Sequence, residues 1–144
     1  MLIGGDANEI GVFVGYTTDW LPAHSKGKIN LYVYRFMHVP SNWRMAGLVA
    51  PHGFEVRYHF GDLSGSWWVP EGMPEDPGLN GEDVTVAENT MRMWVNFAAT
   101  GDPSVDGLIE WPAFRPKAGE DKYVTIDVKP EVQSGFLSTF RPGR

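Results

Sequence analysis

The chain has 144 residues and a formal net charge of −6 at neutral pH, with 42% hydrophobic, 13% aromatic and 21% charged residues. This length and balance are typical of one globular domain and exclude a disordered or coiled-coil protein. The Lys and Arg residues form no run that could neutralise a series of phosphates, so we expect no nucleic-acid partner. There is no cysteine, which excludes a disulfide framework, a thiolate metal site and a cysteine nucleophile.

The sequence shows neither a membrane-spanning run nor the pattern of a signal peptide. No apolar run approaches the roughly 18 to 20 residues that span a bilayer. The first residues, MLIGGDANE, lack the basic-then-apolar order of a signal peptide. We therefore expect a soluble protein without a membrane span. The compartment stays open, and the missing cysteine and signal peptide favour the cytoplasm slightly.

Two strands are predicted in the first quarter of the chain. Leu2 and Ile3 run into the turn-forming residues that begin at Gly4, which predicts the end of a strand whose beginning precedes this sequence. The run INLYVYRFM, from Ile29 to Met37, is nearly continuous in β-branched and aromatic residues. It predicts a strand that is buried on both faces, at the centre of a mainly parallel sheet.

The best-defined predicted element is a helix over residues 83–103. Thr85 and Glu88 have the spacing of a capping box, and Gly101 and Pro103 supply the stop. The pattern predicts one apolar helical face, made of Ala87, Met91, Trp94, Val95 and Ala98. We interpret Met91 and Trp94 as core residues rather than as part of a cofactor site.

The remaining segments predict a long loop, a strand and a short helix. Residues 60–82 are rich in Gly, Pro and acids and predict an irregular surface connection, in which Trp67 and Trp68 anchor the loop or cover a pocket. Residues 122–128 alternate in polarity and predict a strand with one wetter face, at an edge of the sheet. The last segment predicts a short helix that docks Phe136, Leu137 and Phe140.

The sequence offers a candidate general base and a candidate orienting acid, but no activated serine. His52 in PHGFE can act as a base, although a histidine between Pro and Gly is more often a turn residue. Glu9 in GGDANEIG can orient it, although an acid after Gly-Gly more often caps a turn or helix. The motif G-x-S-x-G does not occur. We expect no metal and no cofactor, because the four histidines lack ligand spacing: His24, His38, His52 and His59.

Five segments in this order resemble one known family. LIGGDANEIGVFV is similar to an acid-bearing loop, LYVYRFMHVP to the strand that follows it, and PHGFEVRYHFGDL to a histidine motif. MRMWVNFAATGDPS and EWPAF are similar to a late helix and a Trp-Pro segment. The chain resembles the carboxyl-terminal part of the type-B carboxylesterases, the esterase, lipase and cholinesterase family of α/β-hydrolases. One departure is Ile10, which intervenes between Glu9 and Gly11.

The resemblance implies a fold, an activity and two site residues. The fold class is α/β, with residues 1–144 forming the carboxyl-terminal portion of an α/β-hydrolase sheet with flanking helices, incomplete as a domain. The activity is hydrolysis of a small carboxylic ester. Glu9 is then the acid and His52 the general base of a Ser-Glu-His triad, in the chain order typical of α/β-hydrolases. Glu55, in the same motif as His52, is interpreted as structural.

Two features of the family are missing from this chain. The nucleophile motif and the glycine-rich oxyanion segment of the family lie upstream of the acid loop. The family also inserts a long helical region where this chain has twenty residues, from Gly11 to Asn30. The chain is then a fragment of a longer enzyme, one piece of a two-chain enzyme, or an inactive remnant. A strand buried on both faces favours a partner segment or chain that carries the serine.

The alternative is a noncatalytic binding or protein-interaction module. The absent serine favours this alternative, as do the tryptophans in predicted loops, which are Trp20, Trp43, Trp67 and Trp68. The ordered family motifs and the strand-then-helix order count against it.

Overall fold

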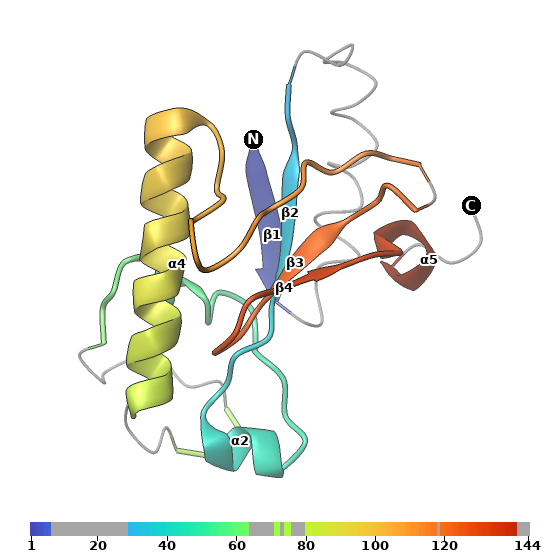
Figure 1. The fold of residues 1–144 in the computed structure, drawn as a ribbon. Coiled ribbons are helices and arrows are strands. Elements are labelled where there is room, and N and C mark those ends of the chain that lie inside the picture. The colour runs from blue at the N-terminus through green and yellow to red at the C-terminus, as the bar shows by residue number, and fades with distance from the viewer. Residues whose placement is uncertain (7–28, 64–70, 73, 76–79, 118, 141–144) are drawn as a thin grey trace.

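The computed structural model of the chain describes residues 1–6, 29–63, 71–72, 74–75, 80–117 and 119–140 (Figure 1). Its strands are β1 (Leu2–Asp6), β2 (Tyr32–Phe36), β3 (Tyr123–Ile126) and β4 (Glu131–Gln133). Its helices are α2 (Ser41–Met45), α3 (Val56–His59), α4 (Gly81–Thr100) and α5 (Phe136–Phe140). No helix in these ranges is long and apolar enough to cross a membrane.

The four strands form one sheet in the order β1-β2-β3-β4. β1, β2 and β3 are parallel and β4 pairs with β3 antiparallel, which confirms the α/β class and the central place of β2. The predicted turn at Gly4 is wrong, because β1 continues to Asp6, which pairs with Phe36. The predicted edge position of the strand at 122–128 is also wrong, since β4 covers the outer side of β3.

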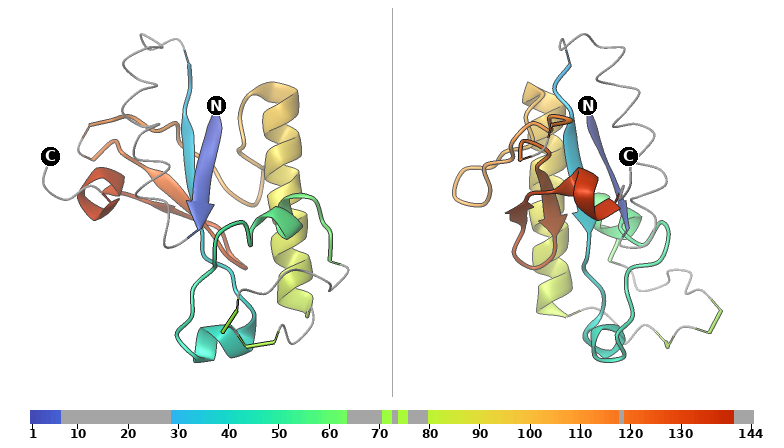
Figure 2. Two further views of the ribbon diagram at one scale, coloured as in Figure 1. Left: turned by 180° about the vertical axis from the view of Figure 1, so that it is seen from behind. Right: turned by 90° about the vertical axis from the view of Figure 1, so that its right-hand side faces the viewer.

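Helices cover both faces of the sheet. This explains why the sequence around β2 is nearly continuous in apolar and aromatic residues. Figure 2 shows α4 on one face of the sheet and α5 on the other. Tyr32, Tyr34 and Phe36 contribute to the core that α4 covers. Leu31 and Val33 contribute to a second core with Phe136 of α5. Alternate residues from Leu31 to Phe36 therefore enter opposite cores, which is why all of them except Arg35 are apolar or aromatic.

Helix α4 begins and ends at polar caps. The side chain of Asn80 accepts hydrogen bonds from the backbone N–H groups of Glu82 and Asp83, at 2.7 and 3.3 Å. The carboxylate of Asp83 accepts one from the Asn80 N–H at 2.9 Å, which completes a capping box. The box predicted at Thr85 is wrong, because Thr85 lies inside the helix and donates to the carbonyl of Gly81.

The carboxyl end of α4 and its buried face agree only in part with the predicted pattern. Gly101 caps the helix with φ of 81°, as predicted. Ala87 is buried, but Val95 is 68% exposed and Ala98 is exposed as well. The buried face of α4 consists of Asp83, Val86, Ala87, Thr90 and Met93. Two of these residues are polar, so apolar spacing alone selected the wrong side for the last turns.

Gly4 of β1 lies directly under an aromatic ring. A Cβ atom at this position would be 2.3 Å from ring carbons of Tyr34, its cross-strand partner. The ring has little room to move, because it packs edge-on against Trp94 at 5.1 Å and His59 at 5.8 Å. The absence of a side chain at Gly4 therefore lets β1 approach β2 with the ring in place.

We expect Gly4→Ala to lower the free energy of unfolding by about 1 to 3 kcal/mol, as overpacking of a filled core does. Urea denaturation followed by tryptophan fluorescence measures this change. Gly81→Ala is the matched control, since a Cβ there meets nothing within 4 Å and alanine favours the first turn of a helix. Equal stability of the two variants would contradict the packing argument.

Candidate active site

His52 lies on a tight turn between α2 and α3. The backbone N–H of Phe54 donates to the carbonyl of Pro51 at 3.1 Å, and that of Val56 donates to Gly53 at 3.2 Å. Gly53 has φ of 77°, a backbone conformation that residues other than glycine rarely adopt. His52 itself is exposed, unlike Phe54, which is 4% exposed. The imidazole of His52 therefore lies at the surface, while the buried side chain of Phe54 anchors the turn.

Aromatic packing fixes both flanks of this turn. Trp43 of α2 and Phe54 lie 5.1 Å apart between ring centroids, and Phe54 lies 5.9 Å from Tyr58 of α3. The indole N–H of Trp43 donates to the carbonyl of Pro74 at 2.9 Å. Trp43 and Tyr58 are completely buried. The rings therefore join α2, the turn and α3 into one packed unit.

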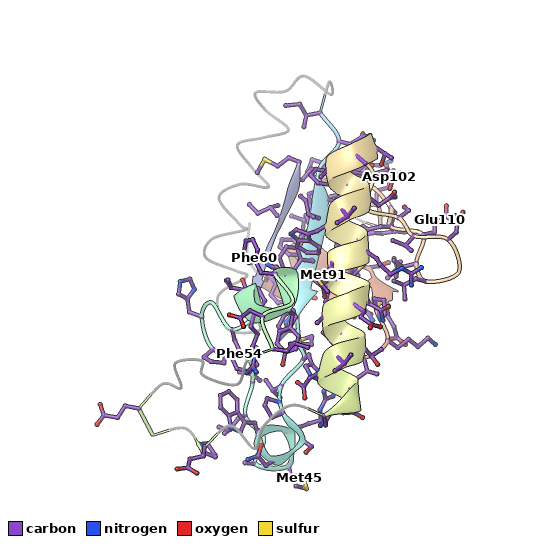
Figure 3. All side chains as sticks on the ribbon, turned by 90° about the vertical axis from the view of Figure 1, so that its left-hand side faces the viewer. Met45, Phe54, Phe60, Met91, Asp102 and Glu110 are labelled. Atoms are coloured by element: carbon purple, nitrogen blue, oxygen red, sulfur yellow. The ribbon has the colours of Figure 1, made fainter. Side chains whose placement is uncertain are left out.

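Arg57 adds a positive charge beneath the turn. Its side chain is completely buried. Its guanidinium carbon lies 5.5 Å from the ring centre of Phe54 and 5.6 Å from that of Tyr58. Figure 3 shows α3, between the labelled Phe54 and Phe60, beside α4 with Met91. The packing of α3 on α4, and of Arg57 on the Phe54 and Tyr58 rings, holds the carboxyl side of the His52 turn.

A cluster of charged and polar side chains lies at the carboxyl end of the sheet, where His38 follows β2 and Asp127 follows β3. His38 is 1% exposed, and its Nε2 lies 2.9 Å from Asp83 Oδ1 while its Nδ1 lies 3.1 Å from Asp127 Oδ1. Arg44 of α2 donates two hydrogen bonds of 2.9 Å to the Asp127 carboxylate. The phenol of Tyr58 donates to Asp83 Oδ1 at 2.8 Å. We call these five residues the His38 cluster.

The charges of the His38 cluster stabilise one another. Burial alone would lower the pKa of His38, but the hydrogen bonds to Asp127 and Asp83 raise it above 6.5. Burial alone would raise the pKa of Asp83, but hydrogen bonds from His38, the Asn80 N–H and Tyr58 lower it to about 2. For Asp127, hydrogen bonds from His38 and Arg44 likewise outweigh burial and lower the pKa. Below the raised pKa of His38, the cluster therefore holds an imidazolium between two carboxylates.

The three histidines in the described ranges have different environments. His38 is enclosed by two carboxylates, whereas His59 stacks on Trp94 at 4.3 Å between ring centroids. Burial lowers the pKa of His59 to about 4, against the opposing charge of Glu55, so its ring is neutral at pH 7. His52 is the exposed one. No group of three or more described His, Asp or Glu side chains is arranged to hold a metal ion.

The two predicted site residues can be placed only in part. His52 occupies a surface turn with a well-packed base, as described above. Glu9 and the loop tryptophans Trp67 and Trp68 lie outside the described residues. Sequence reasoning missed the His38 cluster, because its members come from five separate segments and no local spacing connects them. The one available signal was a capping acid at the start of α4, and the wrong residue was selected for it.

The sheet, the helices on its two faces and the loops at its carboxyl end are those of part of an α/β-hydrolase. The carboxylesterase EST55 of Geobacillus stearothermophilus matches 90% of this chain with a TM-score of 0.63 and 25% identity. The match covers 25% of that protein. The model of the carboxylesterase family matches residues 9–140, and the chain belongs to this family.

Curated relatives agree with this assignment. Carboxylesterase 5A of Canis lupus familiaris is 34% identical over 110 residues, which are 73% of this chain and 18% of that protein. Acetylcholinesterase of Bungarus fasciatus is 31% identical over 134 residues, which are 89% of this chain and 19% of that protein. The chain thus spans about a fifth of the length of these relatives.

Proposed function

We propose that residues 1–144 are a partial α/β-hydrolase domain that supplies the acid and the general base for hydrolysis of carboxylic esters. His52 is the base and Glu9 the acid of a Ser-Glu-His triad. The serine and the oxyanion donors come from an amino-terminal segment or a separate chain. The observation that carries the proposal is the exposed His52 on its rigid turn, within a family match that includes both residues.

The topology of the sheet supports the proposed contact between Glu9 and His52. β1 and β2 are parallel neighbours, and Asp6 pairs with Phe36 at their carboxyl ends. The carboxyl ends of both strands therefore lie on the same side of the sheet, and open α/β sheets bind their ligands at the carboxyl ends of their strands. Glu9 follows Asp6 by three residues, a reach of about 10 Å at full extension. We infer from this reach that a contact of Glu9 with the segment that follows β2 is compatible with the length of the chain.

The proposed chemistry is acyl transfer through serine. The imidazole of His52 takes the proton of the serine hydroxyl as the oxygen attacks the ester carbonyl, and it then gives that proton to the departing alcohol. A water molecule repeats the sequence on the acyl-enzyme and releases the carboxylic acid. The carboxylate of Glu9 accepts a hydrogen bond from the ring, which fixes the tautomer and stabilises the imidazolium.

The edge of the sheet supports a partner segment. Among the described strands, β1 has β2 as its only neighbour, so its other side is an edge. Strands of parallel sheets are normally covered, because an open edge exposes unpaired backbone N–H and C=O groups. A strand of the serine-bearing segment, added beside β1, would pair with these groups. We expect complex formation to protect the outward-facing amides of β1 from hydrogen exchange.

Reconstitution tests the proposal. The chain is mixed with an amino-terminal carboxylesterase segment that carries G-x-S-x-G and ends ahead of the acid loop, and hydrolysis of a short-chain aryl ester is followed. We expect turnover from the mixture and none from either piece alone. A stable complex without turnover, or a ligand-binding chain that never hydrolyses ester, would favour the noncatalytic module instead.

A further inference from the structure

The ring of His38 makes two contacts that only its protonated form satisfies together. Each ring nitrogen faces a carboxylate oxygen, Asp83 Oδ1 at 2.9 Å and Asp127 Oδ1 at 3.1 Å. A neutral imidazole has one N–H donor, so one of the two carboxylates would face a lone pair. Arg44 Nη2 is farther from Nδ1, at 3.4 Å, than the carboxylate is. The geometry therefore favours the imidazolium, which donates to both acids.

The two carboxylates connect His38 to the two helices that flank the His52 turn. Asp127 binds Arg44 of α2 through two parallel hydrogen bonds of 2.9 Å. Asp83 accepts a hydrogen bond from the phenol of Tyr58, in α3, at 2.8 Å. α2 ends at Met45 and α3 begins at Val56. The segment 46–55, which carries His52, thus begins and ends next to elements that the cluster holds.

Backbone hydrogen bonds join the segment to both helices. The N–H of Leu48 donates to the carbonyl of Trp43 of α2 at 2.9 Å, and the N–H of Tyr58 of α3 donates to the carbonyl of Glu55 at 3.0 Å. Within the segment, the N–H of Phe54 donates to the carbonyl of Pro51 at 3.1 Å. The Trp43 and Phe54 rings pack against each other across the segment. Since Trp43 belongs to α2 and Phe54 also contacts Tyr58 of α3, a change in the separation of α2 and α3 would move the turn.

We propose that His38 is a positioning residue for His52: as an imidazolium it holds Asp83 and Asp127 together, and through them it fixes α2 and α3 around the turn. The catalytic consequence rests on the proposed function, in which His52 is the base. The structural consequence, an ordered 46–55 segment, does not depend on it. The two can be measured separately.

Hydrogen exchange on the intact chain tests the structural consequence. His38→Gln retains a donor near the Nε2 position, toward Asp83, and His38→Asn retains one near Nδ1, toward Asp127. We expect each to speed exchange at the Leu48 and Phe54 amides by about tenfold or more, while β3 and the middle of α4 change less. Asp121→Asn is the matched control, because Asp121 is also a buried acid but bonds Gly119 and Leu137.

Two results would overturn the proposal. One is a uniform rise of exchange through β3, α4 and segment 46–55 in the His38 variants, as a purely global destabilisation produces. The other is unchanged exchange at Leu48 and Phe54. The Asp121→Asn control separates these cases, since it is expected to lower stability without a selective effect on the segment.

A pH series on the unaltered chain gives a test that needs no variant. Asp83 and Asp127 have lowered pKa values, Arg44 has a raised one, and the pKa of His38 is raised above its ordinary 6.5. As pH rises above 6.5, His38 is therefore the first group of the cluster to change charge. Within the described ranges, the charged and titratable groups around His38 are Arg44 from α2, Tyr58 from α3, Asp83 from α4 and Asp127 after β3, with Glu82 of α4 acting on Arg44. We expect protection of Leu48 and Phe54, corrected for intrinsic exchange, to fall as pH rises through the pKa of His38. Constant protection would contradict the proposal.

Kinetics of the reconstituted complex test the catalytic consequence. A positioning role predicts that His38→Gln and His38→Asn lower kcat by about tenfold and change KM little, since they misplace the base rather than the ester. A change in KM alone would overturn this consequence. If the unaltered complex shows no turnover, the proposed function fails while the exchange result stands on its own.

Discussion

His52→Ala is expected to lower kcat for aryl-ester hydrolysis by roughly 10⁴-fold or more in the reconstituted complex. Without the imidazole no group removes the serine proton, and none returns a proton to the departing alcohol. The side chain is exposed, so its removal leaves no cavity in the core, and urea denaturation checks that the variant stays folded. Initial rates at saturating ester, set against active-site concentration, measure the effect.

Met45→Ala is the matched control for this experiment. Met45 lies in α2, is 83% exposed and belongs to neither the proposed triad nor the His38 cluster. We expect its kcat to equal that of the unaltered complex. If His52→Ala keeps kcat within tenfold of the control, His52 is not the base and the assignment of the triad is wrong.

The sequence predicts the layers of this fold better than it predicts their boundaries. The apolar run before Pro40 identified β2 as central, because a strand buried on both faces cannot alternate. The stop at Gly101 and the docking of Phe136 were also predicted correctly. The edge position of β3 was wrong, since the pairing of the short strand β4 depends on a contact that no local pattern reveals.

In the candidate site, the sequence indicates the residue with a local signal, His52, but not the His38 cluster, which long-range contacts assemble. His52 stands out because Pro51 and Gly53 constrain the backbone around it, and these are adjacent residues. The His38 cluster does not stand out, because His38 and Asp127 are 89 positions apart and meet only when β2 and β3 pair. Asp83 was missed for a further reason: a buried acid on the inner face of α4 breaks the apolar pattern that was used to find that face.

Asp83→Asn is expected to lower the free energy of unfolding at pH 7 by about 2 kcal/mol. Asp83 combines three roles: it closes the capping box with Asn80, binds His38 and accepts the phenol of Tyr58. Asparagine has a similar shape but no charge, and only one of its two terminal atoms accepts hydrogen bonds. Urea denaturation at pH 7 measures the loss. Glu88→Gln, on the exposed face of the same helix, is the control and should change stability little.

The pH dependence of that loss shows whether the charge of Asp83 is responsible. Its pKa in the folded chain is about 2, below the ordinary value of 3.8, so the folded state binds fewer protons than the unfolded state between these values. The stabilisation is therefore present above about pH 4 and disappears as pH falls toward 2. His59, whose pKa is lowered to about 4, also disfavours folding as pH falls below 6.5, but it is present in both proteins and cancels in their difference. The stability curves of the parent chain and Asp83→Asn should accordingly converge between pH 4 and 2. A difference that stays constant over this range would assign the loss to the altered hydrogen-bond geometry rather than to the charge.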